Sequence, residues 1–174
     1  HCIDLYQNIP PALPKDYCVR RTSTIVAVVG SFVTYRSTSE WVRGEHNGER
    51  LVAFFTIDLT KPDRPSSLTD MFGPTTLAVI HWPTAVSNPD CPLAAQSPPP
   101  SPTTTSFVVT SLKSGEAHVL VRQPLAQNQF FGCPYAEYEI TISVPSSARP
   151  AFDLASKRGT LLGTSWFLGI QRAA

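Results

Sequence analysis

The sequence predicts an all-β domain with one short helix near its carboxyl end. Three observations predict it: short runs of β-branched and aromatic residues, clusters of Pro, Gly, Ser and Asn between those runs, and a total of 17 prolines. Many short strands separated by turn residues are typical of a β-sandwich or barrel, whereas proline is disfavoured inside helices. At 174 residues the chain fits a single domain with a sizeable core.

Each expected strand is a run of apolar, β-branched or aromatic residues that ends at a cluster of turn residues. The helix is expected to begin near Arg149-Pro150, because proline suits the first helical turn, and to stop by Gly159. The expected strands are residues 24–36 with a bend or bulge at Gly30, 51–58, 76–82, 105–112, 117–123, 135–144 and 165–171.

Two proline-containing segments are expected to lack regular structure. One is an amino-terminal arm over residues 1–22, and the other is a loop over residues 85–105, where prolines are mixed with Ser and Thr. Both belong to one domain that covers residues 1–174.

Charge and hydropathy argue against two classes of partner. Fourteen Lys and Arg residues against thirteen Asp and Glu leave a net charge of +1, and no basic run is longer than Arg20-Arg21. The concentrated positive charge typical of a nucleic-acid-binding protein is therefore missing from the sequence. The longest continuous apolar stretches have five residues, far fewer than the ~20 of a membrane-spanning helix. We therefore expect no nucleic-acid binding and no membrane span.

The four cysteines indicate an oxidising compartment. Cys2, Cys18, Cys91 and Cys133 form an even set without C-x-x-C spacing, which favours two disulfides over a metal site, with four free thiols as the alternative. Of the three pairings we favour Cys2–Cys18 with Cys91–Cys133, since the first pins the amino-terminal arm and contributes about 3 kcal/mol. A chain that begins with His1 is typical of a mature protein without its signal peptide. We expect it to be secreted or to lie in the secretory-pathway lumen.

Four fragments bring carboxylates, imidazoles or prolines to the ends of apolar runs. Two imidazoles beside a carboxylate can hold an oxyanion by charge-assisted hydrogen bonds, and such binding strengthens as pH falls toward about 6. The sequence therefore predicts a small anion pocket. Its predicted lining is Asp58, Lys61, Asp63 and Arg64 from the first fragment, His81 and Trp82 from the second, Pro98, Pro99 and Pro100 from the third, and His118 from the fourth.

Each of these residues also has a structural explanation. Asp58 can cap a turn at a strand end, His81 can be a core histidine bonded to a carbonyl, and His118 can be a solvent-facing strand residue. Trp82 is favoured as a core anchor over a ligand platform. The joint occurrence of the fragments in one order supports the pocket more than any single residue does.

The order of the fragments resembles that of the phosphatidylethanolamine-binding protein (PEBP) family, and the proline-rich opening is similar to that of fungal members. The resemblance covers about two thirds of the chain, from Leu51 onward, and includes Arg122-Gln123-Pro124 and the ending at residues 162–171. It implies an antiparallel β-sandwich with a short carboxy-terminal helix, no cofactor, and a pocket for small anions. In this chain His81 and His118 would line that pocket with Asp58 or Asp63. The family's two acids are three residues further apart here, which brings Lys61 between them.

The resemblance implies two classes of function. Secreted PEBP-like proteins of fungal secondary metabolism assist the dimerising cyclisation of maleic-anhydride-derived monomers in maleidride (nonadride) biosynthesis. In such a cofactor-free cyclase, His81, His118 and Asp58 would be catalytic, with one imidazole taking a proton while Lys61 or Arg64 steadies a carboxylate. The alternative is a non-catalytic serine carboxypeptidase inhibitor or small-acid binding protein. The expected partners are an anionic small molecule and a carboxypeptidase or pathway enzyme.

Overall fold

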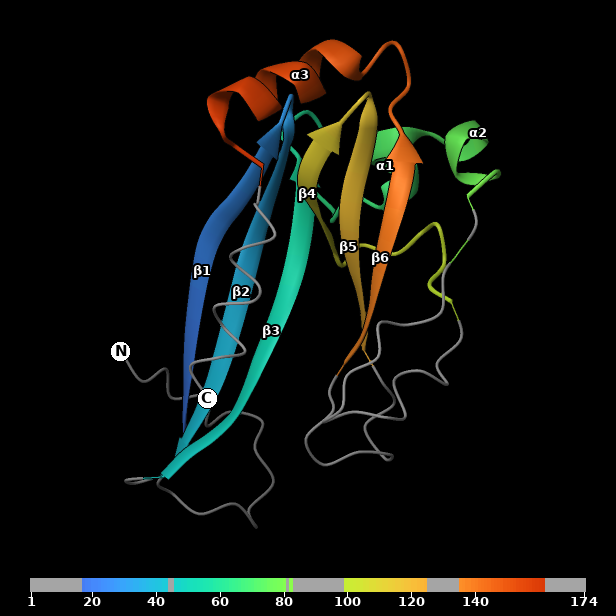
Figure 1. The fold of residues 1–174 in the computed structure, drawn as a ribbon. Helices are drawn as coiled ribbons and strands as arrows, with labels where there is room; N and C mark the ends of the chain where they lie inside the picture. The colour runs from blue at the N-terminus through green and yellow to red at the C-terminus, as the bar shows by residue number, and fades with distance from the viewer. Residues whose placement is uncertain (1–16, 44–45, 81, 83–98, 125–134, 162–174) are drawn as a thin grey trace.

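Two three-stranded antiparallel sheets contain more than half of the residues that the structure describes (Figure 1). The computed structural model describes residues 17–43, 46–80, 82, 99–124 and 135–161. Within these ranges the strands are ordered β1-β2-β3 in one sheet and β4-β5-β6 in the other, accompanied by short helices. This confirms the predicted all-β class with minor helix.

The first sheet contains β1 (Tyr17–Val29), β2 (Phe32–Arg43) and β3 (His46–Asp58). The run predicted as one strand over residues 24–36 is divided between β1 and β2, because Gly30 has a φ of 58° and the chain reverses there. Residues 17–22, expected in the amino-terminal arm, instead begin β1, where they pair in register with residues 38–43 of β2.

The second sheet contains β4 (Phe107–Lys113), β5 (Glu116–Pro124) and β6 (Tyr135–Ser143), close to the strands predicted for these segments. Ser114 and Gly115 join β4 to β5 with φ values of 51° and 80°. Two successive positive φ angles are typical of a tight type I′ hairpin turn. The described part of the proline-rich loop, residues 99–105, contains no helix or strand, as predicted.

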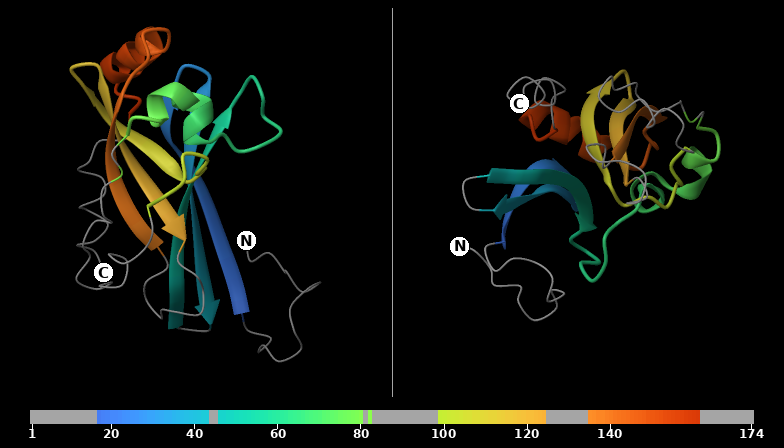
Figure 2. Two further views of the ribbon diagram at one scale, coloured as in Figure 1. Left: turned by 90° about the vertical axis from the view of Figure 1, so that its right-hand side faces the viewer. Right: turned by 90° about the horizontal axis from the view of Figure 1, so that it is seen from below.

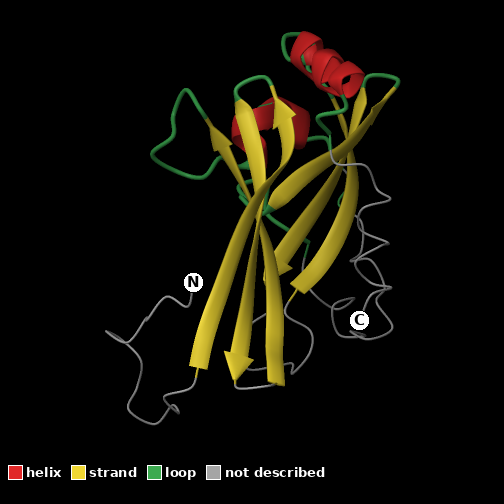
Figure 3. Ribbon diagram, turned by 90° about the vertical axis from the view of Figure 1, so that its left-hand side faces the viewer, coloured by secondary structure: helices red, strands yellow, loops and turns green. Residues whose placement is uncertain are grey.

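The helices lie toward one end of the strands (Figure 3). The predicted helix is α3 (Arg149–Arg158), with a proline in its first turn and Gly159 at its end, where the φ of 66° is easily adopted by glycine. It lies across the upper ends of the sheets in Figure 1. The chain then returns to β1, where the Val28 N–H donates to the Thr160 carbonyl at 2.9 Å.

The strand predicted over residues 76–82 is wrong. The sequence there forms α2 (Pro74–Leu77), directly after α1 (Leu68–Phe72). Gly73, with a φ of 82°, ends α1, and Pro74 opens the next helical turn. A short apolar run such as residues 77–80 fits either a buried strand or a buried helical turn, so its pattern alone does not decide.

The main core lies between one face of the second sheet and the three described helices. It includes Phe107, Val109, Ala117, Val119, Val121, Tyr138, Ile140 and Ile142 from the strands and Leu68, Phe72, Leu77 and Phe152 from the helices. A second cluster, Ala27, Phe54, Val108 and Leu120, joins the two sheets, which lie side by side when the molecule is seen from below (Figure 2). The second sheet is therefore partly covered on both faces.

Two sets of predictions lie outside the described residues. The favoured disulfides involve Cys2, Cys91 and Cys133, and the side chain of Cys18, none of which is described. The closing strand at residues 165–171 is also outside. Among the described helices, none combines the length and the apolar composition that a bilayer crossing requires.

Candidate functional site

The turn after β3 is closed by Asp58, the first predicted pocket acid. Its Oδ1 accepts hydrogen bonds from the backbone N–H and the hydroxyl of Thr60 at 3.0 and 2.9 Å. The Asp58 N–H donates to Ser66 Oγ at 2.9 Å, and the Ser66 N–H donates to the Thr56 carbonyl at 2.7 Å, so both ends of the turn are tied together. The Thr60 N–H, followed by the Ser31 hydroxyl, lowers the pKa of Asp58. Its carboxylate thus has the turn-capping role that sequence analysis gave as the structural explanation.

Lys61, Asp63 and Arg64 lie on the exposed outer part of this turn. The Arg64 guanidinium forms a two-pronged ion pair with Asp70 of α1, at 3.0 and 2.8 Å. Asp70 also accepts from the Ser67 N–H at 2.8 Å while Ser67 Oγ accepts from the Asp70 N–H, which is a capping box at the start of α1. The charge of Arg64 is therefore engaged within the fold. Sequence analysis missed Asp70, although its S-x-x-D spacing with Ser67 is a readable signal.

Replacing Asp70 with Asn is expected to destabilise the protein by about 1 kcal/mol near pH 7, through loss of the cap and of a partly exposed ion pair. Arg64 and Ser67 hold the pKa of Asp70 well below its usual range. A carboxyl with a lowered folded-state pKa stabilises above its unfolded value of about 3.9, and loses this contribution as pH falls below it. The difference in unfolding free energy should therefore shrink in urea titrations near pH 3. Asp153→Asn, an exposed acid of α3, is the control, and a pH-independent difference would contradict the assignment.

The proline segment is attached to the same region. The Leu68 N–H donates to the Thr104 carbonyl at 3.1 Å, and the Thr69 N–H donates to the Pro102 carbonyl at 3.2 Å. Pro100 is buried, whereas Pro99 is exposed. The turn after β3 and the adjoining helix α1 are thus joined to the proline segment, which lies much further along the chain. Of the predicted proline wall, Pro98 lies outside the described residues.

Trp82 is partly buried and packs against the main core, as expected of a core anchor. Its neighbour in the sequence, His81, lies outside the described residues.

His118 lies on β5 and is partly buried. Its neighbours Ala117 and Val119 belong to the main core, and side chains alternate along a strand, so the imidazole is on the opposite face of the sheet. It lies between Ser111 of β4 and Thr141 of β6 in the register. Trp82 packs on the core side instead. The convergence of His81 and His118 on one pocket stays a prediction.

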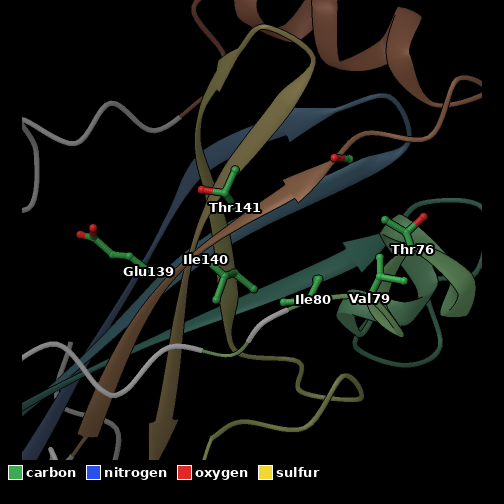
Figure 4. A pocket seen from close by; sticks show the side chains of 7 residues that line it. Thr76, Val79, Ile80, Glu139, Ile140 and Thr141 are labelled. Carbon is green, nitrogen blue, oxygen red and sulfur yellow. The ribbon is translucent and has the colours of Figure 1, made fainter.

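A hollow of about 350 Å³ lies between α2 and β6 (Figure 4). One of its residues, Ile80, directly precedes His81, and another, Thr141, is directly opposite His118 on the neighbouring strand. Sequence analysis did not find this hollow, because it assigned residues 76–82 to a strand. The lining residues are Thr76, Val79, Ile80, Glu139, Ile140, Thr141 and Ser143.

The described lining combines three hydroxyl groups, three aliphatic side chains and the carboxylate of Glu139. Val79 is 84% exposed and offers apolar surface to a ligand. Such a mixture is typical of small-molecule sites, where apolar walls carry a few polar groups that fix orientation. Among the described residues, no three His, Cys, Asp or Glu side chains are arranged to hold a metal ion.

Comparisons with family models, with curated proteins and with solved structures found no match to this chain.

Proposed function

We propose that this chain is a PEBP-like protein that binds a small carboxylate- or phosphate-bearing ligand at the hollow between α2 and β6. One observation supports the proposal: each wall of the hollow includes a residue next to one of the two histidines that the sequence singled out, in the chain order or in the strand register. Ile80 precedes His81 on one wall, and Thr141 on the other pairs with His118. Directly opposed residues have Cβ atoms about 4.5–5.5 Å apart, which leaves His118 within reach of a ligand that contacts Thr141.

The proposal assigns the positive charge of the site to the imidazoles. Arg64 is paired with Asp70, and Asp58 caps its own turn, so neither is available without breaking local contacts. Protonated imidazoles donate charge-assisted hydrogen bonds to an oxyanion, and the hydroxyls of Thr76 and Thr141 add neutral donors.

A PEBP-type antiparallel sandwich is part of the same proposal. Its support is the second cluster, in which Ala27 and Phe54 of one sheet pack against Val108 and Leu120 of the other. The short helix α3 near the carboxyl end also fits this arrangement.

The catalytic form of the proposal is a secreted, cofactor-free cyclase that acts on maleic-anhydride-derived monomers. One imidazole would take a proton from the activated methylene while the other steadies the carboxylate of the substrate. This form requires product formation to depend on both histidines.

The exposed turn at residues 59–65, which we call the rim, favours a second candidate. This is a carboxypeptidase inhibitor that contacts the enzyme through the rim. Leu59 is 63% exposed, and the hydrogen bonds between Asp58 and Ser66 hold the base of the turn. A pre-organised turn loses little entropy on docking to a protein.

The test is a titration of the protein with maleate and with phosphate, followed by NMR, near pH 6 and pH 8. We expect saturable binding that is tighter at the lower pH, where imidazoles are protonated. His118→Ala and His81→Ala should each weaken it about tenfold, the value of one charge-assisted hydrogen bond. His46→Ala, at the far end of β3 from Asp58, is the matched control.

Binding that is unchanged in both histidine variants, or no saturable binding at all, would refute the anion site. The two functional classes are separated by activity: cyclised product lost in both variants supports the cyclase. Carboxypeptidase inhibition that survives both substitutions supports the rim-binding inhibitor instead.

A further inference from the structure

Strand β6 forms an outer edge of the second sheet in the part of the chain that the structure describes. Sheet edges are usually protected against further pairing by a bulge, a proline or a lysine. The outer strand of the first sheet, β1, has such a bulge between Ile25 and Ala27. The nine residues of β6 include neither proline nor lysine, and their register with β5 runs without a shift. The edge of β6 is therefore suited to accept a further strand.

The backbone groups of every second residue of β6 point to this open edge. The Val144 N–H donates to the Gly115 carbonyl at 3.0 Å, in line with the register of β5 and β6. Hydrogen-bonded and non-hydrogen-bonded pairs alternate along an antiparallel ladder, so every second residue counted back from Val144 bonds to β5. The residues between them direct their N–H and carbonyl groups away from β5. They are Ser143, Thr141 and Glu139.

The hollow between α2 and β6 lies along the same edge. Its lining includes Glu139, Thr141 and Ser143, together with Ile140 between them. Because side chains alternate along a strand, Ile140 lies on the face of the main core and the other three lie on the opposite face. Figure 4 shows Ile140 near Ile80 and the Glu139 carboxylate directed away from both. A hollow that touches residues from both faces of a strand lies at the edge of that strand.

An extended peptide along this edge would direct alternate side chains to its two faces. The side chain opposite Ile140 would lie on the side of α2, where Val79 and Ile80 offer apolar surface. Val79 is 84% exposed, so an apolar side chain at this position removes hydrocarbon surface from water. The next side chain, opposite Glu139, would lie on the other face of the sheet. One strand thus reaches both faces, which a small ligand does not.

Glu139 determines which charge the peptide should carry. It is exposed and has no ion pair within the described ranges, whereas Glu137 on the same face is held by Arg122 at 2.6 Å. Directly opposed residues in a ladder have Cβ atoms about 4.5–5.5 Å apart, so a lysine or arginine opposite Glu139 forms a cross-strand ion pair. β6 contains neither residue, so β6 of a second copy cannot supply this charge. The complementary occupant is a basic segment of another protein.

We propose that β6 binds an extended, basic peptide segment of a partner protein by strand addition. The added strand is antiparallel, the orientation that is slightly more stable per residue. Its lysine or arginine lies opposite Glu139, and the preceding valine or isoleucine lies opposite Ile140, beside the hollow. This interaction goes beyond the proposed function, because it depends on backbone groups and on Glu139 and does not involve the imidazoles.

The test uses the blocked peptide acetyl-Thr-Val-Thr-Val-Lys-Thr-amide, titrated into the whole chain near pH 7 and followed by NMR. With its lysine opposite Glu139, the N–H groups of its first, third and fifth residues point to β6, and those of the second, fourth and sixth point away. Methylating the third and fifth N–H groups should weaken binding at least about tenfold, because two hydrogen bonds are lost. Methylating the second and fourth is the matched control, and should change the affinity by less than about twofold, since no bond to β6 is lost.

Two variants of the protein test the same contacts from the other side. Thr141→Pro removes one outward N–H, a change that edge strands tolerate when this group faces solvent. It should weaken peptide binding about tenfold relative to Thr141→Val, which loses the same hydroxyl and keeps the N–H. The wild type should prefer the lysine peptide about fivefold over the same peptide with glutamate in place of lysine, and Glu139→Gln should remove this preference.

Equal affinity for the two methylated peptides, or no saturable binding of the unmodified one, would overturn the proposal. So would unchanged binding by Thr141→Pro with a urea midpoint that shows it to be folded. A dimer in sedimentation that Thr141→Pro abolishes would assign the edge to a second copy instead. The proposed function is judged separately: His118→Ala should weaken maleate binding and keep the difference between the methylated peptides.

Discussion

Phe152→Ala is expected to destabilise the protein by about 3–5 kcal/mol, the usual cost of emptying a buried phenylalanine site. Phe152 of α3 is 1% exposed, and its ring centroid lies 5.5 Å from that of Phe72 in α1. The ring therefore connects the carboxy-terminal helix to α1 and, through it, to the helix that walls the hollow. Its loss leaves a cavity that the neighbouring strands fill only in part.

The matched control for this prediction is Leu154→Ala, on the same helix but 48% exposed. Surface truncations usually change stability by less than about 0.5 kcal/mol. Urea unfolding should show a lower midpoint with an unchanged slope for Phe152→Ala only. Similar midpoints for the two variants would mean that α3 is not anchored through this ring.

The strands and α3 could be predicted because their signals are local. Proline in the first turn and glycine after the last bound α3, and the hairpin turns at Gly30 and Ser114-Gly115 depend on residues that tolerate or favour positive φ. These signals need no knowledge of the rest of the chain. Even so, Gly30 was expected as a bend or bulge within one strand, where the chain in fact reverses.

The candidate site could be predicted only in part, because its geometry depends on long-range packing. Helices α1 and α2 have five and four residues, too few for a helical period to emerge from the pattern. The hollow exists because α2 packs beside β6, a contact between segments far apart in the sequence.

The role of Asp58 shows how one signal fits two explanations. An acid at a strand end is expected both in a ligand pocket and in a capped turn. The structure shows the second, since Thr60 occupies Oδ1. Arg64 was likewise predicted to line a pocket, and the structure instead pairs it with Asp70. That partner lies in α1, a helix that was not predicted.

Arg122 connects the two sheets through polar and aromatic contacts. Its Nε donates to Glu137 Oε1 at 2.6 Å, and its Nη1 donates to the Val52 carbonyl of β3 at 3.0 Å. The guanidinium carbon lies 5.0 Å from the ring centre of Phe54 and 5.5 Å from that of Tyr135. The side chain is only 14% exposed, so these interactions are weakly screened. One residue of β5 thus holds the edge of the first sheet.

Arg122→Met is therefore expected to destabilise the protein by about 2–3 kcal/mol, somewhat below the range for a fully buried pair because Glu137 is 29% exposed. Methionine keeps much of the apolar stem but leaves the Glu137 carboxylate and the Val52 carbonyl without their donor. Urea unfolding provides the measurement, with the exposed Arg158→Met of α3 as control. In the double variant with Glu137→Gln, part of the loss should be recovered, since no charge is then left unpaired. Equal stability of Arg122→Met and Arg158→Met would show that Arg122 does not help to hold the two sheets together.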